Sequence, residues 1–337
     1  MARPTIKDVS RLAGVSIGTV SNVVNGHPNI SPVTRQRVED AIGKLGYKPN
    51  RAAKSLPKGR TGLLGYRMPG AGHLNPSMDI FLHQVVESAG SLGFEVLLFT
   101  PGPDQSELDA YTDVLNRGGV DAFLLAGIEY EDPRVQFLEQ RGVPFSAFGR
   151  AGRHKRSVYV DVDGAAGIEK AVRHLIETGR ERIAFLGWPA GSLTGDERFR
   201  GWREALIDAG LDPHDDLVMR SDDGYEEGRS VADQIVDRQF DAVVCVSDTF
   251  GLGVMAGLRQ HGITPGLEVA VTGFDDVAAS MLVEPGLTTV RQPMATVGGE
   301  MVTRLARILG GEDGDESGLL IEPELVIRGS SSARARD

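Results

Sequence analysis

Short polar side chains gather between residues 16 and 25, and their type suits contacts with DNA. Thr19, Ser21, Asn22 and Asn25 fall on the predicted exposed face of one helix, where hydroxyl and amide groups can bond phosphates and base edges. Residues 1–60 carry 11 Lys and Arg against 3 Asp and Glu, whereas the other 277 residues carry 25 against 44. With a net charge of −11 and one basic end, the chain is expected to attract DNA through that end.

Three short helices must position these side chains, and the sequence predicts each of them. Thr5 and Asp8 form an acidic variant of the capping box at the start of the first helix, and Gly14-Val15 forms the turn after it. The second helix is expected over 17–25, and Ser31-Pro32 opens the third. The side chains expected to pack between the helices are Ile6, Val9, Leu12, Val20, Val23, Val24, Val33, Val38, Ile42 and Leu45.

This pattern is typical of a helix-turn-helix DNA-binding unit. The alternative is a small helical cap that binds nothing, and the local positive charge and the polar helix face favour DNA binding over it. The head closely resembles that of the LacI/GalR family of bacterial transcription repressors in five segments: Thr5-Ile6-Lys7-Asp8-Val9, Ala13-Gly14-Val15-Ser16, Thr19-Val20-Ser21, Val24-Asn25-Gly26 and Leu45-Gly46-Tyr47-Lys48-Pro49-Asn50.

The resemblance implies that the second helix enters the major groove. Ile17, Gly18 and Asn22 would then face base edges; Asn can pair with adenine, Ile can contact a thymine methyl group, and Gly leaves one reading position blank. Phosphate contacts are expected from Thr5, Ser16, Thr19, Ser21, Asn25 and Thr34.

Residues 49–60 are expected to form a linker that folds when DNA is present, because so short a segment is not a stable helix alone. The resemblance implies a hinge helix that contacts DNA through Asn50, Arg51, Ala53 and Leu56. Leu56 matches the family's apolar wedge, which enters the minor groove and kinks the duplex. The alternative is an ordinary interdomain linker.

From residue 61 short apolar runs alternate with amphipathic segments, which is typical of parallel sheets covered by helices. Strands are expected at 62–66, 94–99, 120–125, 143–148, 182–187, 242–246 and 269–273. Helices are expected near 77–92, 105–118, 133–141, 165–178, 197–210, 225–237 and 249–262. The expected fold is therefore α/β: a small all-α helix-turn-helix head and a two-lobed body with a ligand cleft at the carboxyl ends of the strands.

The body resembles the periplasmic-binding-protein-like sensor of the same family, and this resemblance sets the expected domain bounds. The head is expected over 1–48 and the sensor over 61–330, followed by a disordered tail at 331–337. Lobe one would comprise about 61–160 and 291–320, and lobe two about 161–290. No apolar leader and no stretch of about 18 apolar residues is found, so the sequence predicts a cytoplasmic protein with no membrane partner.

The resemblance also implies an effector site between the lobes. Arg198 and Asp275 match the family's effector-binding pair, which would hydrogen-bond sugar hydroxyls; the alternative is a structural ion pair. Further effector contacts are expected from Tyr225, Ser247, Trp188, Asn75, Arg67 and Arg150. Gly149-Arg150 stands where many family members have Asp-Arg, which suggests a roomier pocket that suits an oligosaccharide.

The expected function is a ligand-responsive repressor of carbohydrate-use genes that binds a palindromic operator as a homodimer and is released by a sugar. A purine or another metabolite acting as corepressor is the alternative. A dinucleotide-dependent enzyme is a remote one, because Gly251-x-Gly253-x-x-Ala256 lies inside a helical pattern. The histidines lack metal spacing and no cofactor is expected.

Overall fold

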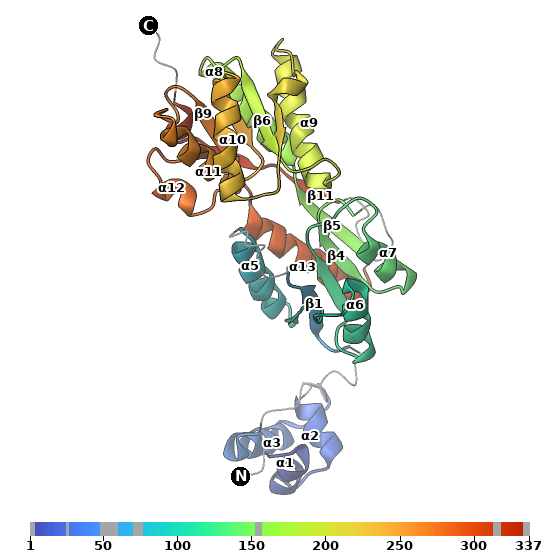
Figure 1. Cartoon of the computed structure of the whole chain (residues 1–337). Helices are drawn as coiled ribbons and strands as arrows, with labels where there is room; N and C mark the ends of the chain where they lie inside the picture. The colour runs from blue at the N-terminus through green and yellow to red at the C-terminus, as the bar shows by residue number, and fades with distance from the viewer. Residues whose placement is uncertain are drawn as a thin grey trace. The chain divides into compact units, whose positions relative to one another are not determined.

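The computed structural model describes residues 4–24, 27–47, 60–69, 77–151, 157–312 and 318–332 (Figure 1). The chain divides into two units, a helical head that ends by Gly62 and an α/β body that begins at Leu63. The expected fold class is therefore confirmed.

The head packs three short helices around a small apolar core. They are α1 (Ile6–Ala13), α2 (Ile17–Val24) and α3 (Pro32–Leu45). The capping interaction predicted at α1 is present, because the Thr5 backbone N–H and hydroxyl donate to Asp8 Oδ2 at 2.9 and 2.7 Å. Val9, Val20 and Val38 are fully buried where the helices meet.

Two of the residues expected in this core are instead exposed. Val33 is 71% exposed, because it stands five residues before Val38 and so about 140° around α3 from the buried stripe. Leu12 is 51% exposed, because Val9 and Ala13 already define the narrow face that α1 buries. The core of so small a unit has room for one stripe from each helix.

Lobe one of the body is built on a parallel sheet. Its strands are β1 (Leu63–Arg67), β2 (Glu95–Phe99), β3 (Ala122–Leu125), β4 (Phe145–Phe148), β5 (Ser157–Val162) and β11 (Leu319–Ile321). The order across the sheet is β11-β5-β4-β3-β1-β2. Its helices are α5 (Ser77–Ser91), α6 (Glu107–Asn116), α7 (Pro133–Gln140) and α13 (Met294–Gly310).

Lobe two repeats this plan with one antiparallel edge strand. Its strands are β6 (Ile183–Gly187), β7 (Val218–Arg220), β8 (Ala242–Cys245), β9 (Ala270–Phe274), β10 (Thr288–Arg291) and β12 (Glu324–Val326), in the order β12-β10-β9-β8-β6-β7. Its α-helices are α8 (Gly164–Glu177), α9 (Leu193–Asp208), α10 (Tyr225–Asp237), α11 (Asp248–Gln260) and α12 (Ala279–Leu282). Short 3₁₀ turns lie at Asp215–Leu217 and Gly329–Ser331.

The chain passes between the lobes after β5, after β10 and after β11 (Figure 1). Helix α13 returns to lobe one, where Met301 and Leu305 pack in one core with Phe81 and Val85 of α5. Strand β12 then pairs antiparallel with β10 in lobe two, a return that the bounds expected for lobe two, 161–290, did not include. Two of these crossing segments, after β5 and after β10, contribute Val162, Gly164 and Gln292 to a pocket between the lobes.

The glycines of the Gly251-x-Gly253 pattern lie in α11, where Gly253 allows α10 to pack closely and Gly251 faces Leu287 and Gly273. A Cβ atom at Gly253 would stand 2.2 Å from the Tyr225 carbonyl oxygen, and one at Gly257 would stand 2.4 Å from that of Arg229. These contacts explain the small residues without a dinucleotide. Across the described residues no helix is long and apolar enough to span a membrane, and no cluster of three His, Cys, Asp or Glu side chains has a geometry that suits a metal ion.

Candidate DNA-reading helix and effector pocket

Helix α2 presents the predicted base-reading residues at the surface of the head. Ile17 is 44% exposed, and Gly18 and Asn22 are also exposed. Ser16 caps the helix, because its Oγ accepts from the Thr19 backbone N–H at 3.0 Å and bonds to the Thr19 hydroxyl at 2.9 Å. The helix therefore displays Ile17 and Gly18 on its capped first turn and Asn22 on its second turn.

The turn before α2 is held by a residue that the sequence analysis did not single out. Gly14 has a φ of 63°, which ends α1 in the left-handed conformation that glycine favours. Arg37 of α3 donates through Nη2 to the carbonyl oxygens of Ala13 and Gly14, at 2.5 and 3.3 Å. Arg37 therefore ties α3 to the carboxyl end of α1, next to the turn.

Of the remaining predicted DNA contacts, three lie at the surface or partly buried in the head, and five fall outside the described residues. Thr5 is exposed at the start of α1, and Thr34 is half-buried at the start of α3, where its backbone N–H donates to Ser31 Oγ at 3.2 Å. Ser21 is half-buried on α2. Outside the described residues lie Asn25, Asn50, Arg51, Ala53 and Leu56.

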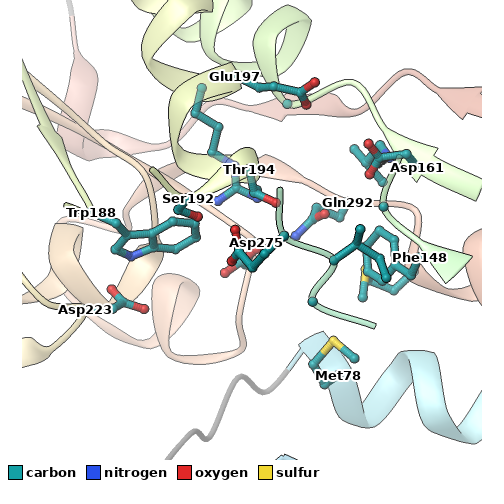
Figure 2. A pocket seen from close by; sticks show the side chains of 18 of the residues that line it. Met78, Phe148, Asp161, Trp188, Ser192, Thr194, Glu197, Asp223, Asp275 and Gln292 are labelled. Carbon is teal, nitrogen blue, oxygen red and sulfur yellow. Dashed lines mark hydrogen bonds between the residues drawn. The ribbon is translucent and has the colours of Figure 1, made fainter. Parts of the chain in front are cut away.

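A cavity of about 450 Å³ opens between the two lobes at the carboxyl ends of the strands (Figure 2). Lobe one contributes Glu129 after β3, Phe148 at the end of β4 and Asp161 in β5. Lobe two contributes Trp188 after β6 and, from α9, Glu197. Two aromatic rings and several carboxylates thus face one space from opposite sides.

Arg198, predicted to bind the effector, lines this cavity and is only 4% exposed. Its guanidinium lies 3.6 Å from the centre of the Phe274 ring and 5.3 Å from that of Trp188, and it donates to the Val246 carbonyl oxygen. Burial lowers the pKa of Arg198 from its ordinary value. Its Nε is buried and has no hydrogen-bond partner among the described residues, which leaves an unsatisfied donor beside the cavity.

Asp275, the second member of the predicted pair, also lines the cavity. It follows β9 with a φ of 114°, a strained conformation of the kind that collects at binding sites. Its Oδ1 accepts from Gln292 Nε2 at 2.5 Å, and Gln292 lies in the crossing segment between β10 and α13 (Figure 2). The next residue, Asp276, is fixed by Arg291 Nε at 2.6 Å and by Arg328.

Arg150, another predicted contact, stands behind the wall instead of forming it. Its Nη1 lies 2.7 Å from Glu197 Oε1 in lobe two and its Nε lies 3.3 Å from Asp161 Oδ2 in lobe one. Burial raises the pKa of Asp161 to about 6, and burial also raises the pKa of Glu197. Arg150 therefore joins the lobes through two carboxylates that themselves line the cavity.

The other predicted effector residues divide into three groups. Trp188 lines the cavity, and its buried indole Nε1 has no partner among the described residues. Ser247 lies one layer back, donating to Asp223 Oδ1 at 2.6 Å and so orienting a carboxylate of the wall. Tyr225 is 46% exposed outside the wall, because α10 begins two residues after Asp223.

Arg67 also lies outside the wall, where its Nε pairs with Glu107 Oε1 at 2.7 Å within lobe one. Asn75 is not among the described residues. Six further wall residues were not predicted from the sequence: Phe148, Asp161, Glu197, Asp223, Glu129 and Gln292. One available signal was the carboxylate of Asp161 in the otherwise apolar run Val158–Val162.

Comparison with known proteins gives one consistent result. Residues 5–50 match "Bacterial regulatory proteins, lacI family", and residues 172–331 match "Periplasmic binding protein-like domain". The HTH-type transcriptional regulator CelR of Thermobifida fusca is 37% identical, and the aligned region covers 97% of this chain and 98% of CelR.

Two solved structures support the same assignment over the whole chain. A CelR–cellobiose complex is 35% identical, with a TM-score of 0.73, covering 97% of this chain and 100% of that one. The lac repressor dimer bound to operator and the anti-inducer ONPF is 26% identical, with a TM-score of 0.83, covering 98% and 100%. The relatives are transcriptional regulators and not enzymes, so the dinucleotide alternative is excluded. The chain belongs to the LacI family of bacterial regulatory proteins, whose members are ligand-responsive transcriptional regulators.

Proposed function

We propose that this protein is a dimeric repressor that binds a palindromic operator and is released by an oligosaccharide of the cellobiose type. The observation that carries the ligand assignment is the cavity between the lobes, in which Arg198 and Asp275 face a space of about 450 Å³. A volume of this size suits a small sugar chain. Similarity to a regulator solved as a cellobiose complex supports the same class.

Two aromatic side chains support a sugar over a compact polar ligand. Phe148 of lobe one and Trp188 of lobe two stand on different walls of the cavity. A pyranose presents one apolar face, which stacks on an aromatic ring, and hydroxyl groups at its edge, which suit carboxylates and guanidinium groups. One glucosyl ring on each aromatic side chain would place the ligand across both lobes, so binding would hold the lobes together.

The helix-turn-helix supports operator binding, with Ile17 and Asn22 as the residues that read bases. Dimerisation follows from the way such heads recognise two half-sites. Apolar side chains on the body offer a surface for it: Ile80 and Val86 on α5 are 58% and 50% exposed, and Leu282 on α12 is 81% exposed. We propose that the linker comprises residues 49–60. A dimer formed through the body would then present two heads to one duplex.

The switch we propose operates through that linker. In the ligand-free protein the two linkers lie close enough to fold in the minor groove, with Leu56 as the wedge. Ligand that closes the cleft rotates the lobes and separates the linkers, which removes these contacts. Leu56→Ala should therefore retain ligand binding and lose operator affinity by about 100-fold, whereas unchanged operator affinity would refute the wedge.

The experiment that tests the proposal starts from a random-sequence duplex library. Sequences retained by the protein are identified, and the strongest is labelled and titrated with protein by fluorescence anisotropy, with and without saturating cellobiose. The proposal expects a palindromic site, two protomers per duplex and weaker binding with cellobiose. Tighter binding on addition of a purine, with no response to cellobiose, would replace it with the corepressor alternative.

A further inference from the structure

The cavity between the lobes carries an excess of negative charge. Among the described residues six carboxylates line it: Glu129, Asp161, Glu197, Asp222, Asp223 and Asp275. Figure 2 shows four of them, Asp161, Glu197, Asp223 and Asp275, around the same space. The guanidinium that lines the cavity is that of Arg198. Counting also Arg150 behind the wall and Arg220, whose Nη1 donates to the Trp188 carbonyl oxygen at 2.7 Å, the carboxylates still outnumber these cations by six to three.

The charge of Arg198 is already partly compensated within the protein. Its guanidinium lies over the Phe274 ring and donates to the Val246 carbonyl oxygen. Arg150 is likewise committed, since it lies between Asp161 and Glu197. An incoming phosphate would therefore meet cations that already have partners and carboxylates that repel it. At water-like screening, three excess charges about 8 Å away reduce the local concentration of a monovalent anion about threefold and that of a dianion about tenfold.

The wall also requires hydrogen-bond donors from its ligand. Ionised carboxylates only accept hydrogen bonds, so the acceptor sites still open on them call for O–H or N–H groups. Five of the six already have one partner within the protein: Asp161 and Glu197 pair with Arg150, and Glu129, Asp223 and Asp275 accept from Leu193, Ser247 and Gln292. Few hydrogen-bond donors in the wall are left unpaired: the buried atoms Arg198 Nε and Trp188 Nε1 have no partner among the described residues. A saccharide satisfies this pattern because each hydroxyl donates as well as accepts. A phosphate ester adds hydrogen-bond acceptors, which find few donors in a wall made mainly of carboxylate acceptors.

We propose, building on the proposed function, that this pocket selects unphosphorylated saccharides and rejects phosphorylated sugars and nucleotides by charge. The reaction that supplies the ligand must then leave its hydroxyl groups free, as hydrolysis of a polysaccharide followed by non-phosphorylating uptake does. A kinase or a phosphoryl-transferring uptake step acting on the same saccharide would remove the signal. The regulator would therefore respond to the concentration of the free saccharide before any phosphorylation.

The electrostatic potential in the pocket can be measured without any ligand, because Trp188 lines the cavity and its fluorescence can be quenched by ions that enter it. The chain has two tryptophans, and the other, Trp202, is fully buried. Quenching of Trp188 fluorescence by caesium, acrylamide and iodide, each normalised to N-acetyltryptophanamide, reports cation, neutral and anion access. We expect caesium to be favoured over iodide about tenfold at 0.1 M salt, approaching parity at 1 M. Equal or greater access for iodide would overturn the proposal. Trp188→Phe supplies the background from Trp202.

Calorimetry with a charge series then tests selection itself. Cellobiose, 6-amino-6-deoxycellobiose and cellobiose 6-phosphate differ at one position, and the phosphate ester is expected to bind at least about tenfold more weakly than cellobiose. Charge repulsion predicts that added salt narrows this gap, whereas a purely steric effect would leave it unchanged and would overturn the charge account. Adenosine and its monophosphate form a second pair. A phosphate ester that binds more tightly than its parent refutes the inference while leaving sugar sensing intact. If cellobiose does not bind but caesium still quenches Trp188 better than iodide, the proposed ligand is refuted and the negative potential of the pocket is not.

Discussion

The head and the pocket treat negative charge in opposite ways. Residues 1–60 carry eight more basic than acidic side chains, and α2 carries the uncharged polar side chains of Thr19, Ser21 and Asn22. The pocket gathers six carboxylates from both lobes. On the proposed function, a basic head would concentrate a polyanion and leave base choice to short neutral side chains, whereas an acidic pocket would exclude anions and leave ligand choice to hydrogen bonds and stacking. The opposite charges of the head and the pocket would thus keep DNA at the head and an uncharged ligand in the pocket.

The largest expected effect concerns the scaffold beneath the pocket. Gly253→Ala should lower the free energy of unfolding of the body by about 3 kcal/mol or more, because the new Cβ would overlap the Tyr225 carbonyl oxygen. Urea denaturation of the full chain measures it. Gly90→Ala is the matched control: in α5 its Cβ meets nothing within 4 Å, so helix propensity should stabilise the protein by up to about 1 kcal/mol. Equal effects of the two substitutions would contradict the packing role.

Within the pocket, Arg198→Met should weaken cellobiose binding roughly 100-fold and leave operator affinity without ligand unchanged. Methionine retains a flexible apolar side chain against Phe274 but removes the buried donor, and hydrogen bonds to charged groups contribute about 1.5–3 kcal/mol. Arg173→Met on the exposed face of α8 should change neither affinity. A variant at Arg198 that still responded fully to cellobiose would remove this residue from the site.

On the head, Asn22→Ala should cost about 1–3 kcal/mol of discrimination at one operator base pair. The exposed side chain of Asn22 is not part of the helical core, so the thermal midpoint should stay within experimental error. Competition binding between the selected operator and single-base variants measures the change. If all sequences lost affinity equally, Asn22 would be a phosphate contact instead.

A pH dependence of stability is expected from a carboxylate of the pocket. Burial raises the pKa of Asp161 to about 6, above the value near 3.8 expected in the unfolded chain. The folded state thus favours the protonated carboxyl, and this contribution is present below pH 4 and is lost as the pH rises through 6. Asp161→Asn stays neutral, so its stability relative to wild type should rise by about 2 kcal/mol between pH 4.5 and 8. A difference independent of pH would contradict the shift.

The sequence predicted the head better than the pocket because the determinants of the head are local. The cap at Thr5, the turn at Gly14 and the polar face of α2 each depend on residues a few positions apart. Even here the contact from Arg37 was missed, because it reaches back 24 residues to Ala13. Exposure of Val33 was also missed, although its position about 140° around α3 from Val38 places it off the buried stripe.

The pocket depends on contacts between segments far apart in the sequence. Resemblance to the family supplied Arg198 and Asp275, but Gln292 is brought to Asp275 by a crossing segment that periodicity does not place. Arg150, Asp161 and Glu197 meet only after both lobes have folded. Strand β5, which carries Asp161, was not predicted, and the three-residue strands β7, β11 and β12 are too short to show a pattern.

In the proposed switch, a cellobiose-type ligand and the operator each weaken the binding of the other to the same protein. Calorimetric titration of cellobiose into the free protein and into the operator-bound protein tests it most directly, because coupling between two sites is reciprocal. The account predicts that operator weakens cellobiose binding by the same factor by which cellobiose weakens operator binding. Equal cellobiose affinity in both titrations, or tighter binding to the operator complex, would contradict it.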